Sequence, residues 1–183
     1  KDKELKSYGF NSQLPEVLTL LQTYREQIPK QIEVMHLLQL EARMTKMLYK
    51  LAASNTKRAG FTRDHEGIDK ANGFLGNYLA YGLGATTTWV LGIAHGFAVM
   101  HGKTRRGALV FDIADIVKDA IVLPLAFICA SENTSEQEFR QECLNYFTQY
   151  NALDVMFDTV KALALKKDWD VIPVENTPIG GDK

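Results

Sequence analysis

The sequence has no excess of positive charge and very little cysteine. Its 21 lysines and arginines face 22 aspartates and glutamates, for a formal net charge of −1. Overall attraction to nucleic acid is therefore excluded, and any nucleic-acid contact must come from a local basic patch. Cys129 and Cys143 are the only cysteines and form no Cys-x-x-Cys pair. We expect both thiols to lie in or near the core of a protein from the reducing cytoplasm.

Charged residues are missing altogether between Leu79 and Met100, a stretch long enough to cross a bilayer. Its glycines, its threonines and His95 favour a buried helix running into a loop, so we expect no membrane contact. The N-terminal segment KDKELKSYGF lacks the apolar run of a secretory signal. Because the chain begins at Lys1 rather than Met, we expect it to be a piece of a longer protein.

A helical spacing of apolar residues runs along nearly the whole chain. With 183 residues and 46% hydrophobic content, we predict one all-α domain, 1–183, of about six to seven helices. Its core would cover about 12–166, and 167–183 would form a loose tail. The expected helices follow Ser12, cover about 31–55 and 71–93, run on from 108 with a kink or division at Pro124, and occupy about 135–150 and 152–166. Ser135 and Glu138 have the spacing of a capping box that opens the fifth of these helices.

Two aspartates stand out within the apolar run that begins at Ala108. Asp112 and Asp115 are three residues apart, so they share one helical face, and Asp119 continues that stripe. Carboxylates on a buried helix need a cation, further hydrogen bonds or a raised pKa. A divalent metal would meet that need, and so would Arg105 or Arg106. The alternative is a capped helix start in which Asp112 is paired to those arginines.

Other candidate residues lie before this pair in the sequence. His101 precedes a compact basic loop containing Lys103, Arg105 and Arg106, which could hold phosphate beside a metal site or form an ordinary solvated loop. Glu41 lies in the middle of the 31–55 helix and shares a face with apolar residues. An inward glutamate is unusual unless it is paired. The alternative is an ordinary partner for a lysine one turn away.

One competing metal motif is present. Glu33 and His36 form the Glu-x-x-His of di-iron helix bundles, but such sites need two copies and two further glutamates. The sequence holds a single copy, so a chance match is the favoured interpretation.

At these residues the sequence resembles a known family. The run HGKTRRGALVFDIADIVKDAIVLP closely resembles the CRISPR-associated adaptation integrase of the I-F-like subtype. In that family a histidine is followed by a basic turn and an apolar run ending in Asp-x-x-Asp, here His101, Asp112 and Asp115. An upstream glutamate in a long helix matches LEARMTKMLYKLA, which gives Glu41. The segments GNYLAYGLGATTTWVLGIAHGFAV and EQEFRQECL are also similar, so the resemblance covers most of 30–165.

The resemblance implies the helical catalytic domain of a DNA integrase and endonuclease. The family's β-rich N-terminal domain, through which it dimerises, is absent from this chain. Glu41, His101 and Asp115 would bind Mg²⁺ or Mn²⁺, and Asp112 would stand beside them. The reaction would transfer a prespacer DNA 3′-hydroxyl onto a CRISPR repeat phosphodiester, with a second adaptation protein fused to a helicase-nuclease as partner. The segment between Glu41 and His101 is a few residues shorter than the family pattern.

A different class of function stays open. The chain could be a non-catalytic DNA-binding or assembly domain in which the acidic cluster is purely structural. The two hypotheses differ in what the loss of Asp115 should disturb: metal binding in the first, folding in the second.

Overall fold

A computed structural model describes residues 14–58, 60–63, 69–97, 99–101 and 106–164 of the chain. All regular secondary structure in these residues is helical, which confirms the predicted all-α class. None of the described helices is both long and apolar enough to cross a membrane.

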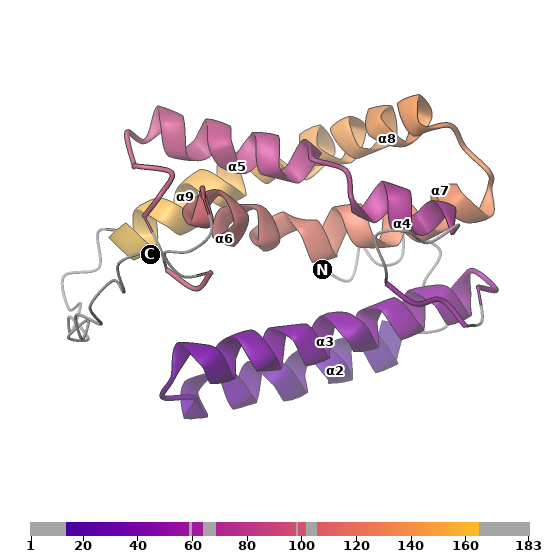
Figure 1. The fold of residues 1–183 in the computed structure, drawn as a ribbon, viewed down its shortest axis with the longest axis horizontal. Helices are drawn as coiled ribbons and strands as arrows, with labels where there is room; N and C mark the ends of the chain where they lie inside the picture. Colours follow the sequence, from indigo (N-terminus) through magenta and orange to yellow (C-terminus); the bar gives the residue numbers. More distant parts are fainter. Residues whose placement is uncertain (1–13, 59, 64–68, 98, 102–105, 165–183) are drawn as a thin grey trace, which may run out of the picture.

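One helical run through the middle of the molecule organises the others (Figure 1). It consists of α6 (Ala108–Val117), the π-helical turn η2 (Lys118–Val122) and α7 (Leu123–Ser131). A hairpin of α2 (Leu14–Gln27) and α3 (Val34–Asn55) lies along one side of this run, with the short turn η1 (Ile28–Lys30) at its bend. The other side holds α5 (Leu79–Val90), α8 (Glu136–Gln149) and α9 (Ala152–Ala164), while α4 (Lys70–Leu75) packs against α7.

Burial explains why this run is central. Seven of the nine residues of α7 are buried, including Phe127, and α6 buries Ile113 and Ala114 almost completely. Helix α5 approaches α6 closely because residue 84 is glycine. A Cβ there would lie 2.6 Å from the carbonyl oxygen of Val110. The close approach fixes α6, and with it the aspartates of α6, against the rest of the core.

The proline in the run is accommodated without ending the helix. Pro124 is the second residue of α7, and the turn before it is π-helical. A proline cannot donate to the carbonyl four residues earlier and its ring crowds that position, so the backbone widens ahead of it. The run is therefore not divided at Pro124, and the predicted interruption takes the form of a π-helical turn. The widened turn carries Lys118 and Asp119, both of which line the cavity described below.

The prediction of one helix over 71–93 is wrong. The chain instead forms α4 and α5, with a break at Gly76 and Asn77. The Asn77 side-chain oxygen accepts the backbone N–H of Leu79 at 2.9 Å, and this bond satisfies a donor at the start of α5. Gly76 ends α4 in a right-handed conformation, and the Asn77 side chain begins the next helix, so these two local signals outweigh the apolar periodicity.

Other helix boundaries agree more closely with prediction. Helix α3 ends at Asn55 as expected but begins at Val34, because η1 and a short extended link occupy the preceding positions. The capping box is confirmed: the Ser135 hydroxyl accepts the Glu138 N–H at 3.2 Å, and a Glu138 carboxylate oxygen accepts the Ser135 N–H at 2.7 Å. The predicted loose tail, 167–183, lies outside the described residues.

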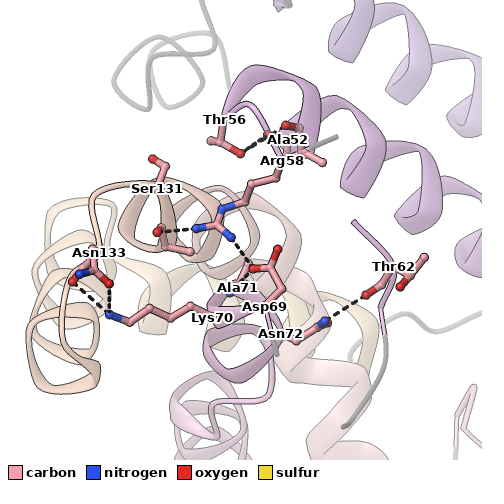
Figure 2. A network of polar contacts seen from close by, with 12 residues as sticks. Ala52, Thr56, Arg58, Thr62, Asp69, Lys70, Ala71, Asn72, Ser131 and Asn133 are labelled. Atoms are coloured by element: carbon pink, nitrogen blue, oxygen red, sulfur yellow. Dashed lines mark hydrogen bonds and ion pairs between the residues drawn. The ribbon is translucent and has the colours of Figure 1, made fainter. Parts of the chain in front are cut away.

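A network of polar contacts joins the end of α3 to α4 and to the turn between α7 and α8 (Figure 2). We call Arg58, Asp69, Lys70 and Asn133 the polar corner. The Arg58 guanidinium donates to the Asp69 carboxylate at 2.5 Å and to the Ala130 carbonyl at 2.5 Å. The Asp69 carboxylate also caps α4, and Lys70 donates to Asn133 at 3.0 Å. The corner therefore fixes where α4 begins.

Candidate functional site

A cavity of about 380 Å³ opens between α3 and the stretch that joins α6 to η2. It brings together residues from four separate stretches of the chain. Its wall consists of Glu41, Ala42, Thr45, Lys46, Tyr49, Arg63, His101, Asp115, Lys118 and Asp119. Three of the four predicted catalytic residues, Glu41, His101 and Asp115, thus line one cavity, and the fourth, Asp112, lies behind His101.

Glu41 comes from α3, where it stands one helical turn before Thr45 on the face directed at the cavity. The side chain is partly buried. Burial raises the pKa of its carboxyl, the negative charge of Asp115 raises it further, and the positive charge of His101 acts in the opposite direction. The sequence-based expectation of an inward glutamate therefore agrees with the structure.

His101 is held by Asp112. The ring Nδ1 lies 2.5 Å from one oxygen of the Asp112 carboxylate, whose other oxygen accepts the Met100 N–H at 3.1 Å. Because an ionised carboxylate can only accept, Nδ1 carries a proton in this pair and Nε2 is directed elsewhere. Nε2 lies 4.0 Å from the Asp115 carboxylate. Asp112 therefore orients the imidazole and is not part of the cavity wall.

Asp115 forms an ion pair with a lysine one turn later on the same run. The Lys118 ammonium lies 3.5 Å from the Asp115 carboxylate and donates to the Tyr81 hydroxyl at 2.9 Å. Burial raises the pKa of Asp115, and the charge of Lys118 offsets part of that rise. Burial alone would lower the pKa of Lys118, but its bond to Tyr81 and the charge of Asp115 raise it overall.

Asp119 is the most buried acid of the cavity. Burial raises its pKa to about 6, and the negative charge of Asp115 contributes to the rise. The Thr45 hydroxyl donates to a carboxylate oxygen of Asp119 at 3.5 Å, which is a long and weak hydrogen bond. The cavity therefore holds three carboxyls, Glu41, Asp115 and Asp119, all of which are harder to ionise than usual.

These donors suit a hard divalent cation, since carboxylate oxygens with one imidazole nitrogen bind Mg²⁺ or Mn²⁺. In the described part of the chain, however, no group of three or more histidine, cysteine or acidic side chains is close enough together to hold one ion as it stands. Binding would require the Glu41 and Asp115 side chains to turn, and Lys118 to release Asp115.

The basic loop can be placed only in part. Lys103 and Arg105 lie outside the described residues, whereas Arg106 is exposed directly before Gly107, the residue that caps α6. The described partners of Asp112 are His101 and Met100, not Arg106. The phosphate-binding role predicted for these three basic residues stays a prediction.

The competing di-iron motif lies away from the core. At the start of α3, Nε2 of His36 lies 3.9 Å from a carboxylate oxygen of Glu33, and the Glu33 and His36 side chains are 70% and 52% exposed. A bundle-core iron site needs ligands that face inward. The placement of this pair therefore supports the interpretation of the motif as a chance match.

Sequence reasoning missed several cavity residues. Lys118 is three residues after Asp115, so its spacing could have revealed the pair. Tyr49 stands one turn after Thr45 on the same face of α3, so helical spacing from Glu41 could have revealed it. Arg63 carried no such signal, because it lies outside the helices. Tyr81 reaches the site through Lys118 alone.

Comparison with known proteins identifies relatives of the chain. Over 168 residues it is 48% identical to the CRISPR-associated endonuclease Cas1 of Pseudomonas aeruginosa (strain UCBPP-PA14), a match that covers 90% of this chain and 52% of the relative. The chain is homologous to part of Cas1. The Cas1 of Pectobacterium atrosepticum is 60% identical over 130 residues, which is 69% of this chain and 40% of that protein. The resemblance found in the sequence is confirmed.

The chain spans about half the length, or less, of these Cas1 relatives. No family model matches it. Among solved structures, one described as the crystal structure of TtCas1 superposes with a TM-score of 0.67 at 21% identity, covering 90% of this chain and 66% of that one. At this identity the likeness establishes a shared fold.

Proposed function

We propose that this chain is the helical part of a Cas1 protein that performs metal-dependent chemistry on DNA. The reaction is endonucleolytic cleavage and, during spacer acquisition, transfer of a prespacer 3′-hydroxyl onto a phosphodiester of the CRISPR repeat. The convergence of Glu41, His101 and Asp115 on one cavity carries this proposal. The names of the two Cas1 relatives, both called endonucleases, support it.

In this proposal, Glu41, Asp115 and Nε2 of His101 hold Mg²⁺ or Mn²⁺. Two observations favour the donor set. Asp112 fixes the tautomer of His101, as carboxylates do for metal-bound imidazoles. Burial raises the pKa of both Glu41 and Asp115, and a bound cation would stabilise their ionised forms. When bound, the metal polarises a phosphodiester and assists ionisation of the attacking hydroxyl or water.

The residues of the chain have further roles in the proposed reaction. Asp112 keeps Nδ1 protonated, so that the lone pair of Nε2 is available to the metal. Lys118 is held by Tyr81 beside Asp115, where its ammonium can stabilise negative charge on a phosphate oxygen. Lys103, Arg105 and Arg106 bind flanking phosphates. The partners of the whole protein are prespacer and repeat DNA, a second copy, and the second adaptation protein fused to a helicase-nuclease.

Calorimetric titration with Mn²⁺ tests the metal site. We expect saturable binding to the wild-type chain and none to Asp115→Asn, which keeps the size of the side chain but loses its charge. Asp154→Asn, an exposed aspartate on α9, is the matched control and should bind as the wild type does. Cleavage of a labelled DNA should follow the same pattern and stop with a chelator. Binding that survives Asp115→Asn would contradict the proposal.

A second candidate function has one observation in its favour. Lys118 already neutralises Asp115 at 3.5 Å, so the acidic cluster could be a structural element of a non-catalytic DNA-binding or assembly domain. In that case the wild-type chain would bind no Mn²⁺, and Asp115→Asn would lower the melting temperature by leaving Lys118 without its partner.

A further inference from the structure

We propose that Arg63 is a DNA phosphate-binding residue in the wall of the cavity and that Asn72 positions it. The inference rests on the proposed function, because it names how the substrate strand is held at the same site. Arg63 comes from the segment between α3 and α4, which precedes the basic loop singled out from the sequence.

Arg63 reaches the cavity from the side of α3. It shares the wall with Tyr49 and Asp119, and a side-chain hydrogen bond joins it to Tyr49. Its Nη1 donates to the Asn72 backbone carbonyl at 3.2 Å and to the Asn72 side-chain oxygen at 3.1 Å. The guanidinium is therefore held at a defined place by groups from both neighbouring helices.

Asn72 is suited to this positioning role. It is one of three buried polar residues among the described ones, with 5% of its surface exposed. Its side-chain nitrogen donates to the Thr62 carbonyl at 3.0 Å, so one side chain fixes both Thr62 and Arg63 (Figure 2 shows the Thr62 contact). The polar corner anchors the start of α4 only three residues earlier, at Asp69. An arginine supported in this way is preorganised for binding.

Charge and geometry point to phosphate as the ligand. The cavity contains three carboxyls, which repel an approaching DNA strand unless cations stand beside them. A guanidinium has five donors in a planar fork that matches two phosphate oxygens, which makes arginine better suited than lysine to this geometry. Such a contact carries no base information, so it should act on any sequence.

The test is the affinity for a short fluorescein-labelled DNA, measured by anisotropy at increasing NaCl concentration. The variants are Arg63→Gln, Arg63→Lys and Arg43→Gln. Arg43 is exposed on α3 and does not line the cavity. Arg43→Gln removes the same charge as Arg63→Gln, so it is the matched control. We expect Arg63→Gln to weaken binding roughly five- to tenfold on two unrelated sequences and to reduce the salt slope by about one. Arg63→Lys should keep the slope, and Arg43→Gln should match the wild type.

Asn72→Ala separates positioning from charge. It keeps the guanidinium but removes its anchor, so the salt slope should stay near that of the wild type while affinity falls roughly threefold or more, since ordering the free arginine costs entropy. Melting curves accompany each variant, and affinities are compared only well below the lowest melting temperature. If wild type and Arg43→Gln bind DNA and Arg63→Gln binds equally well, this inference is overturned while the proposed function stands. If the wild type binds no DNA, both are overturned.

Discussion

In the polar corner, each cation meets hydrogen-bond acceptors: Arg58 pairs with the Asp69 carboxylate, and Lys70 donates to two oxygens of Asn133. In the cavity, by contrast, like charges are gathered. Asp115 raises the pKa of both Glu41 and Asp119, and burial raises all three. Lys118 is the cation placed against Asp115. One molecule therefore contains a charge cluster arranged for stability and another arranged at the expense of stability.

The difference indicates where function lies. Complementary charges with short hydrogen bonds are the expected state of half-buried polar groups in a folded protein. Carboxyls collected where each weakens the ionisation of the next lower the free energy of unfolding, and such clusters concentrate at binding and catalytic sites. The comparison predicts that substitutions in the two regions will change stability in opposite directions.

The largest effect is expected from Arg58→Met in the polar corner. The change leaves the Asp69 carboxylate without its guanidinium partner and removes one of the donors to the Ala130 carbonyl, which still accepts the Asn133 N–H at 3.3 Å. We expect the free energy of unfolding to fall by about 3 kcal/mol, as for other partly buried ion pairs that lose one partner. Urea denaturation of the wild type and the variant measures this difference in the free energy of unfolding.

Arg140→Met is the control for Arg58→Met. Arg140 pairs with Glu136 at 3.5 Å on the exposed face of α8, so its loss should cost less than about 0.5 kcal/mol. Equal costs for the two variants would show that the corner is no more than a surface ion pair.

The opposite sign is expected for Asp119→Asn in the cavity. The folded-state pKa of Asp119, about 6, exceeds its ordinary value, so the folded wild type holds this proton more tightly than the unfolded chain. The stability that Asp119 contributes through this tighter proton binding is therefore fully present below about pH 4 and is lost as the pH rises through about 6. Asparagine does not titrate. In chelator, the variant should match the wild type near about pH 4 and exceed it by about 2 kcal/mol near about pH 7.

Denaturation curves at several pH values measure this crossover. Asp154→Asn, which removes one exposed carboxylate on α9, is the control for the loss of a charge outside the cavity. A stability difference for Asp119→Asn that stays flat from acid to neutral pH would remove the contrast between the two regions.

The sequence predicted the cavity better than it predicted the corner. Asp112 and Asp115 lie on one helix, so their relation follows from helical spacing, and the inward placement of Glu41 follows from its apolar face. The structure adds what spacing cannot give: Asp112 lies behind His101, and Asp115 faces the cavity. The two carboxylates flank one imidazole, with Asp112 at Nδ1 and Asp115 4.0 Å from Nε2, so they have different roles although they share a helical face.

The corner could not be predicted because its contacts are long-range. Arg58 reaches the carbonyl of Ala130, 72 residues later, and Lys70 reaches Asn133, 63 residues later. No local pattern encodes such pairs. The same limit hid Arg63. Tyr49, by contrast, shares a face of α3 with Glu41 and Thr45, and the wrongly predicted helix 71–93 broke at Gly76 and Asn77, which were visible in the sequence.

A smaller effect, on metal binding, should follow Asp112→Asn. The amide keeps one acceptor oxygen for Nδ1 of His101 but loses the charge that favours this tautomer, and it turns an NH₂ group toward the Met100 N–H. We expect Mn²⁺ affinity to fall roughly tenfold, about 1.4 kcal/mol, as for other carboxylates that orient a metal-bound histidine. Calorimetry measures the affinity, and imidazole nitrogen shifts report the tautomer. Unchanged affinity would mean that Asp112 does not orient the metal ligand.

The smallest effect is expected at the capping box beside the corner. Ser135→Ala removes the hydroxyl that accepts the Glu138 N–H, and we expect the melting temperature to fall by about 2–4 °C. The Ser135 side chain, and then its backbone, also hold the pKa of Glu138 below its usual value, so NMR titration of Glu138 should show an upward shift in the variant. Ser131→Ala, whose exposed hydroxyl bonds only within its own turn, should change neither quantity. The side chains of this local cap are exposed and are not part of a cluster of like charges. If its loss lowered the melting temperature as much as Arg58→Met, the corner would owe its stability to local turns rather than to complementary charge.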